Sequence, residues 1–216
     1  MTDAAADTTS RLELAEWRRA VAELYADVRR TADDDPAVAL AHWRAVRERL
    51  YREHPQSPVP ADRRASFEAL HYRHDRSLRF EVRIEPAPAP GPGALPLELP
   101  NSGSDSLAFD RIGSVEIPFE DRPRRLSLFW MRGYSGGLFL PFRDATSGRE
   151  TYGAGRYVID TAKGADLGGD PRRGTLVVDF NFAYQPSCAF DPKWACPLAP
   201  PENRLDRPIR AGERIA

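Results

Sequence analysis

Ser77-Leu-Arg-Phe-Glu-Val-Arg-Ile84 is the stretch that decides the fold class of this chain. Apolar and charged residues alternate along it without interruption: Leu78, Phe80, Val82 and Ile84 fall on one side, and Arg79, Glu81 and Arg83 on the other. A period of two residues is typical of a β-strand that buries one face and leaves the other in water. A sheet is therefore expected from this point on.

The residues before this stretch have helical periodicity. Apolar residues recur three and four positions apart in residues 11–30, and again between Asp35-Pro36 and His54. An Asp-Pro pair suits a helix start, and Pro55 ends the second helix because the residue before a proline disfavours the α region. We expect a disordered N-terminus at residues 1–10, a helical segment at residues 11–60 and a short helix near residues 62–70.

Short apolar runs separated by turn residues follow the stretch. They predict strands at residues 107–110, 112–119, 125–132, 138–143, 156–160 and 175–183, with a hairpin loop at residues 134–137. Short connections without crossover helices favour antiparallel pairing. Residues 186–216 are too rich in proline for central strands. The sequence thus predicts an α+β protein: N-terminal helices packed on a mainly antiparallel barrel or sandwich of about seven strands, with residues 61–216 forming the β domain and its extended, wrapping C-terminal tail.

Composition excludes several classes of function. The 216 residues carry a formal net charge of −1, so the chain lacks the basic surface that nucleic-acid binding needs. It has neither an apolar run long enough for a membrane span nor the basic and apolar regions of a signal peptide. We expect a cytoplasmic protein without a nucleic-acid or membrane partner. Nothing in the sequence indicates a cofactor.

Polar residues on the expected strands are the first site candidates. Asp179 and Asn181 would lie on one face of the strand at residues 175–183, roughly 7 Å apart, and would look either into a pocket or into solvent. Arg143 could bind a carboxylate or phosphate with both arms of its guanidinium, or pair with Asp144 or Glu150.

Two further segments offer candidates. Tyr152-Gly-Ala-Gly-Arg-Tyr157 precedes a strand rather than a helix, so its glycines do not predict a dinucleotide cradle, but Tyr152 and Arg156 could contact a ligand. Glu202 follows two prolines and could be a general base, or could anchor the tail by pairing with Arg156 or Arg204. Anchoring is the better interpretation.

Cys188 and Cys196 allow three interpretations. They could be two buried thiols, a disulfide that staples the tail, or half of a zinc site completed by histidines. All four histidines lie in the N-terminal third of the chain. A zinc site would need the helices folded back onto the tail, so we predict no metal ligand.

Together these segments resemble the signature of the domain of unknown function 1684 family, found in bacteria and archaea. The matching segments are Phe142-Arg-Asp-Ala-Thr-Ser-Gly148, Thr151-Tyr-Gly-Ala-Gly-Arg-Tyr157, Asp179-Phe-Asn181, Ala183-Tyr184, Pro186, Cys188-Ala-Phe190, Cys196-Pro-Leu198, Pro200-Pro-Glu-Asn-Arg-Leu205 and Ala211-Gly-Glu213. Phe182 and Gln185 depart from the pattern. The resemblance covers residues 142–213 and implies a single-domain member. It brings no catalytic residue, cofactor or substrate.

Three hypotheses of function follow. In the first, which we favour, a pocket of the β domain binds a small polar or anionic molecule, and Asp179 or Glu202 could serve as a general base if the protein is an enzyme. The ligand-binding candidates are Arg143, Asp144, Tyr152, Arg156, Asn181, Tyr184 and Asn203. In the second, the same residues form a buried polar network that holds the tail. In the third, the helices bind a partner through their large aromatic residues, Trp17, Tyr25, Trp43 and Tyr51.

Overall fold

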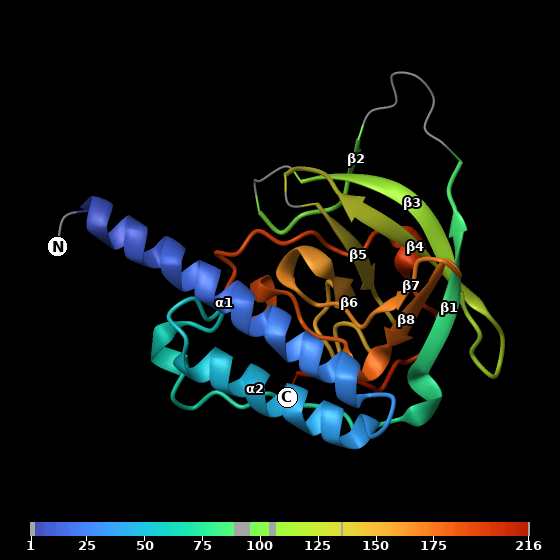
Figure 1. Ribbon diagram of the computed structural model, residues 1–216, viewed down its shortest axis with the longest axis horizontal. Coiled ribbons are helices and arrows are strands. Elements are labelled where there is room, and N and C mark those ends of the chain that lie inside the picture. Colours follow the sequence, from blue (N-terminus) through green and yellow to red (C-terminus); the bar gives the residue numbers. More distant parts are fainter. Residues whose placement is uncertain (1–2, 89–95, 104–106, 135, 216) are drawn as a thin grey trace.

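The computed structural model describes residues 3–88, 96–103, 107–134 and 136–215. Two helices, α1 (Asp3–Thr31) and α2 (Pro36–Glu53), lie beside each other along one side of a curled sheet (Figure 1). Helix α1 begins at Asp3, so residues 3–10 are helical where a disordered N-terminus was expected for residues 1–10, and residues 1–2 lie outside the described residues. Three consecutive alanines near that end favour the helix, since alanine loses the least side-chain entropy there.

Helix α2 has the boundaries that its capping residues predict. Asp35 accepts a hydrogen bond from the backbone N–H of Val38 at 3.1 Å, Pro36 occupies the first turn, and His54 is already extended. The helix expected at residues 62–70 is wrong, because only a 3-10 turn at Ala61–Arg63 forms. Backbone carbonyls of the following segment accept hydrogen bonds from other elements instead: Ala65 from the side chain of Arg52, and Leu70 from the N–H of Arg214.

The described strands form one curled antiparallel sheet, a half-barrel. They are β1 (Arg79–Pro86), β2 (Leu97–Glu98), β3 (Ala108–Ile117), β4 (Arg124–Met131), β5 (Gly137–Phe142), β6 (Arg156–Asp160), β7 (Gly169–Asp170) and β8 (Thr175–Asp179). Their order is β6-β5-β4-β3-β1-β8-β7, and β2 pairs with β3 outside this path. The predicted α+β class and antiparallel sheet are confirmed.

Three of the expected strands have different limits in the structure. The segments expected at residues 107–110 and 112–119 join into β3, with a register shift between Arg111 and Gly113. A Cβ at Gly113 would stand 2.5 Å from the carbonyl oxygen of Glu85, so glycine allows the backbones to approach there. The strand expected at residues 175–183 ends at Asp179, which caps a 3-10 turn at Phe180–Phe182.

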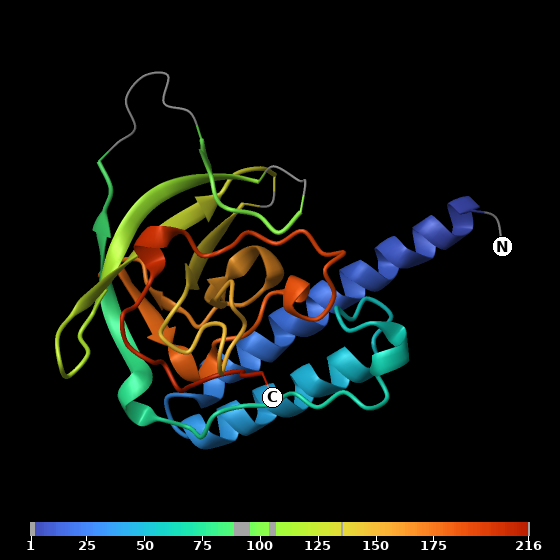
Figure 2. The same cartoon turned by 180° about the vertical axis from the view of Figure 1, so that it is seen from behind.

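The C-terminal tail returns across the open side of the half-barrel. Figure 2 shows it in red, running past β5 and β6 and ending beside α2. Single backbone bridges hold it to distant segments, among them Arg143 to Arg204 and His71 to Glu213. The tail therefore closes one core together with the helices and the sheet.

The helices contribute their aromatic residues to that core. Trp43 is fully buried and meets the ring of Phe182 edge-on, with centroids 5.5 Å apart. Tyr25 and Tyr51 are buried as well, and Trp17 stacks on Tyr51. Trp43, Tyr25 and Tyr51 are thus packed in the core, and Trp17 is partly buried beside them. In the part of the chain that the structure describes, no helix has the length and apolar character needed to cross a membrane.

Candidate functional site

A buried arginine, Arg156 on β6, joins three segments of the signature. Its guanidinium donates to the carbonyl oxygens of Ile209 at 2.8 Å and of Glu213 at 3.0 Å, and also to that of Ala211. It lies 3.6 Å from a carboxylate oxygen of Asp144. Arg156 is 1% exposed, so these tail carbonyls occupy the positions that a ligand would need.

Asp144, in the loop after β5, contacts both Arg156 and the C-terminal tail. Its carboxylate accepts from the Thr146 hydroxyl at 2.8 Å, from the N–H of Ile209 at 2.6 Å and from the Ser147 hydroxyl at 3.2 Å. The Thr146 hydroxyl also lies 2.9 Å from that of Thr151. The turn at residues 144–147 is side-chain capped, as its composition predicts, and it holds the tail.

A second buried ion pair, which the sequence did not suggest, ties the tail to α2. Nε of Arg47 donates to Glu213 at 2.7 Å, and the other carboxylate oxygen of Glu213 accepts from the N–H of Gln185 at 2.8 Å. The guanidinium of Arg47 stacks over the ring of Tyr184 at 4.5 Å, and the Tyr184 hydroxyl donates to Asp160 at 3.3 Å. Tyr184 is therefore part of the core, where it borders a small cavity of about 50 Å³.

Asn203 is fully buried and pairs with backbone alone. Its amide donates to the carbonyls of Ser127 at 2.9 Å and Pro141 at 2.7 Å, and its oxygen accepts from the N–H of Ser127 at 2.8 Å. The neighbouring Glu202 points outward and pairs with Arg111. Its expected pairing with Arg156 or Arg204 is wrong, because Pro200-Pro201 starts a 3-10 turn that places adjacent side chains on opposite sides.

Asp179 and Asn181 do not face a common pocket from one strand. Asp179 Oδ1 accepts from the backbone N–H of Asn181 at 2.9 Å and from its amide at 2.8 Å, while that amide also holds the backbone of Asp75. Asp179 Oδ2 is buried and has no hydrogen-bond partner among the described residues, and it lies 3.6 Å from Arg79. Burial raises the pKa of Asp179, against these hydrogen bonds. The strand ends between the two residues, so the sequence spacing misplaced Asn181.

Arg143 lies apart from the buried network, at the wall of a pocket of about 290 Å³. Its backbone runs beside residues 203–205: its N–H donates to the carbonyl of Asn203 at 2.9 Å, and its carbonyl accepts from Leu205 at 2.7 Å. This pairing brings Arg204 to the same pocket, whose other walls are apolar. They are formed by Pro100, Ala154, Leu198, Ala199 and Pro201.

The two arginines of this pocket carry uncompensated charge. Asp144 pairs with Arg156 and Glu150 pairs with Arg210, so neither neutralises Arg143 as the sequence had suggested. Within the residues that the structure describes, the guanidinium groups of Arg143 and Arg204 make no ion pair and no hydrogen bond, and Nε of Arg143 is buried without a partner. From the sequence, Arg204 was considered only as an ion-pair partner of Glu202. Its position in the wall of this pocket was not predicted.

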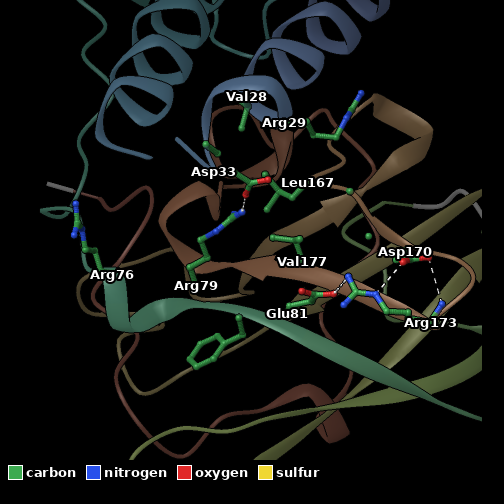
Figure 3. A pocket seen from close by; sticks show the side chains of 14 residues that line it. Val28, Arg29, Asp33, Arg76, Arg79, Glu81, Leu167, Asp170, Arg173 and Val177 are labelled. Atoms are coloured by element: carbon green, nitrogen blue, oxygen red, sulfur yellow. Dashed lines mark hydrogen bonds and ion pairs between the residues drawn. The ribbon is translucent and has the colours of Figure 1, made fainter. Parts of the chain in front are cut away.

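A larger pocket, of about 600 Å³, lies between the end of α1 and strands β1, β7 and β8 (Figure 3). Four arginines and three acidic residues line it: Arg29, Arg76, Arg79, Arg173, Asp33, Glu81 and Asp170. Figure 3 shows Arg173 held between Glu81 and Asp170, and Arg79 directed at Asp33. The charges of this pocket are therefore largely satisfied by one another.

Both cysteines are free thiols and buried. The N–H of Cys188 donates to the sulfur of Cys196 at 3.4 Å, and the hydroxyl of Tyr152 donates to the sulfur of Cys188 at 3.7 Å. Tyr152, expected at a ligand pocket, thus belongs to a thiol cluster. Among the described residues, no group of three or more His, Cys, Asp or Glu side chains could hold a metal ion.

Comparisons with known proteins agree with this architecture. A family model described as protein of unknown function (DUF1684) matches residues 65–214. The chain is also similar to an uncharacterised protein of Haloarcula marismortui solved by solution NMR, at 30% sequence identity and a TM-score of 0.60, over 85% of this chain and 96% of that one. Among curated proteins no significant match is found.

Proposed function

This chain belongs to the DUF1684 family of proteins of unknown function, and we propose that it binds a small anionic molecule in the pocket of Arg143 and Arg204. The observation that carries the proposal is that two arginines from paired backbone segments line one partly apolar pocket, with no acidic partner among the residues that the structure describes. Like charges that line one pocket repel each other, and an anion bound there would relieve that repulsion.

The chemistry of the lining defines the ligand class. Guanidinium groups bind carboxylate and phosphate through paired N–H donors, and two of them favour an anion that offers several oxygens. The apolar walls suit a short hydrocarbon body attached to that anion. A volume of about 290 Å³ lies at the low end for small-molecule sites, so the ligand is a small carboxylate or a phosphate monoester.

The competing pocket of Figure 3 supports the proposal by contrast. It is larger, yet its arginines are mostly paired with acidic side chains, so an incoming anion would have to displace existing ion pairs. Binding at Arg143 and Arg204 requires no such displacement. The two pockets therefore predict opposite outcomes for charge-removing variants.

Titration calorimetry with inorganic phosphate and with a short-chain carboxylate such as butyrate tests this function. We expect saturable binding at high micromolar to millimolar concentration, since each charge-assisted contact contributes about 1.5–3 kcal/mol. Arg204→Gln, at an exposed position, should weaken binding at least several-fold. The double variant Arg143→Gln/Arg204→Gln should show no saturable binding. Arg173→Gln removes the same charge from the other pocket and is the matched control. Equal weakening by Arg173→Gln, or binding that survives the double variant, overturns the proposal.

The general acid–base chemistry suggested for Asp179 or Glu202 receives no support from this arrangement. Neither residue lines the pocket of Arg143, and Glu202 is paired with Arg111 on the surface. We infer a second role for the remaining signature residues, favoured by the contacts of Arg156, Asp144 and Asn203 with tail and sheet backbone: they hold the C-terminal tail in place. Deletion of residues 186–216 tests it. The shortened protein should lose cooperative unfolding, and a cooperative transition in it would refute that role.

A further inference from the structure

The two cysteines of the tail form a cluster of reactive side chains that the proposed pocket does not use. Cys188 lies in the 3-10 turn Ser187–Ala189, and Cys196 follows after a loop. The N–H of Cys188 donates to the sulfur of Cys196 at 3.4 Å, which places the two cysteines in contact. The chain from Cys188 to Cys196 thus forms a loop whose two ends meet at the cysteines.

The side-chain donor beside the pair, the Tyr152 hydroxyl, favours negative charge on the sulfur of Cys188, to which it donates at 3.7 Å. The hydroxyl of Ser102 does not serve this sulfur: it donates to the carbonyl of Trp194 at 2.9 Å and accepts from the N–H of Cys196 at 2.9 Å. The neighbouring Cys196 thiol, helped by the hydrogen bond from Tyr152, lowers the pKa of Cys188 to about 6 against the effect of burial.

The partner thiol keeps its proton. The neighbouring Cys188 thiol and burial both raise the pKa of Cys196, although the positive charge of Lys163 and the hydrogen bond from the N–H of Cys188 oppose them. Tyr157 also faces the pair, and burial raises the pKa of its hydroxyl, so it stays neutral. Cys188 is therefore the thiolate and Cys196 the proton donor of the pair.

The exposure of the two cysteines also differs, and Cys188 is again the more favourable site for reaction. Cys188 is 7% exposed, whereas Cys196 is 1% exposed. Of the two residues, Cys188 is therefore the more accessible to a small reagent. A low-pKa thiolate with some access to solvent, beside a second thiol, is the arrangement that distinguishes redox-active cysteines from inert buried ones.

We propose that Cys188 is a peroxide-reactive thiol and that Cys196 resolves its oxidised form to an intramolecular disulfide. The Cys188 thiolate attacks one oxygen of hydrogen peroxide or an organic hydroperoxide, the O–O bond breaks, and the departing hydroxide or alkoxide takes a proton. The sulfur loses two electrons and becomes a sulfenic acid. The sulfur of Cys196 then attacks that of Cys188, the S–O bond breaks, and the hydroxide leaves as water with the proton of Cys196.

Mass spectrometry on the full chain tests the first and second steps. The reduced protein is treated with one equivalent of hydrogen peroxide, then denatured with a thiol-alkylating reagent. We expect a loss of about 2 Da and no alkylation, which reports an internal disulfide. Cys196→Ser should instead accumulate a sulfenic acid that dimedone traps at residue 188, and Cys188→Ser should leave Cys196 reduced.

Alkylation kinetics of the unaltered protein keep the inference testable if a cysteine variant fails to fold. At pH 7 Cys188 should react with iodoacetamide faster than the same thiol in the unfolded chain, and Tyr152→Phe should slow it several-fold. Tyr134→Phe is the matched control, because Tyr134 is fully exposed. The inference is overturned if both thiols stay reduced in the presence of peroxide. It is also overturned if Cys188 reacts with iodoacetamide only as fast as it does in the unfolded chain.

Discussion

Arg47 of helix α2 and Glu213 near the end of the tail form a buried ion pair across 166 residues of sequence, with Nε and Oε1 2.7 Å apart. Both side chains are almost fully excluded from solvent. The guanidinium lies over the rings of Trp43, Tyr51 and Tyr184, and the second carboxylate oxygen holds the backbone of Gln185. This pair fastens the helical layer, the sheet and the tail at one point.

Arg47→Met should destabilise the protein by about 3–5 kcal/mol, because it leaves the Glu213 carboxylate buried without a cation. Adding Glu213→Gln to this variant should restore part of the loss, since the remaining side chain is neutral and still accepts from Gln185. Urea unfolding of the single and double variants measures the coupling. Additive effects of the two substitutions would show that the pair does not act as a unit.

Asn203→Ala should destabilise the protein by about 2–5 kcal/mol. The substitution removes the hydrogen bonds that the buried Asn203 amide makes with the N–H of Ser127 and with the carbonyls of Ser127 and Pro141, and it leaves these backbone groups buried without that partner. Glu202→Ala is the control one residue away. Its ion pair with Arg111 is on the surface, so the change should stay within about 0.5 kcal/mol. Thermal unfolding of both variants provides the comparison, and equal effects would contradict the role given to Asn203.

Asp179→Asn should make the protein less sensitive to pH between acid and neutral conditions. Burial raises the pKa of Asp179 above its ordinary value of 3.8. The native state therefore binds this proton more tightly than the unfolded state, and the stability it contributes is complete below 3.8 and is lost as pH rises through the folded pKa. Asparagine does not titrate and keeps the oxygen that accepts from Asn181.

Denaturant unfolding of Asp179→Asn and of the unaltered protein at pH 4 and pH 7 measures this effect. Relative to the unaltered protein, the variant should gain stability on going from pH 4 to pH 7. Asp179→Ala, which loses the acceptor for Asn181 as well, should be destabilised at both pH values. If Asp179→Asn instead loses stability relative to the unaltered protein on going from pH 4 to pH 7, the protein stabilises the carboxylate in its charged form.

Gly212→Ala should displace the end of the tail. Gly212 has φ of 75°, and a Cβ there would stand 2.3 Å from the carbonyl oxygen of Ala183. Gly174→Ala is the matched control, because Gly174 also has positive φ (65°) but has nothing within 4 Å of the added atom. The control should cost about 1–2 kcal/mol from backbone strain alone, and Gly212→Ala clearly more. Similar melting temperatures for the two variants would rule out the steric contact.

The sequence by itself determined most of the helices and strands of this protein, although not the segment at residues 62–70. The alternation at residues 77–84, the Asp35-Pro36 helix start and the proline-rich tail are local signals, and each gave the correct type of structure because it depends on neighbours a few residues apart. The prediction from local sequence failed where a side chain redirects the backbone. The carboxylate of Asp179 accepts from the N–H of Asn181 and so caps a 3-10 turn, which ends β8 before Asn181.

Only the tertiary structure decided which polar residues serve the fold and which remain free for a ligand. Arg143, Arg156 and Arg47 are the same residue type, yet tail carbonyls accept the hydrogen bonds of Arg156 and Glu213 neutralises Arg47. Arg143 shares its pocket with Arg204 and has no side-chain partner among the described residues. These differences arise from contacts between residues 53 to 166 positions apart, at distances of a few ångström that set the charge and burial of each group. Local spacing carries no information about them.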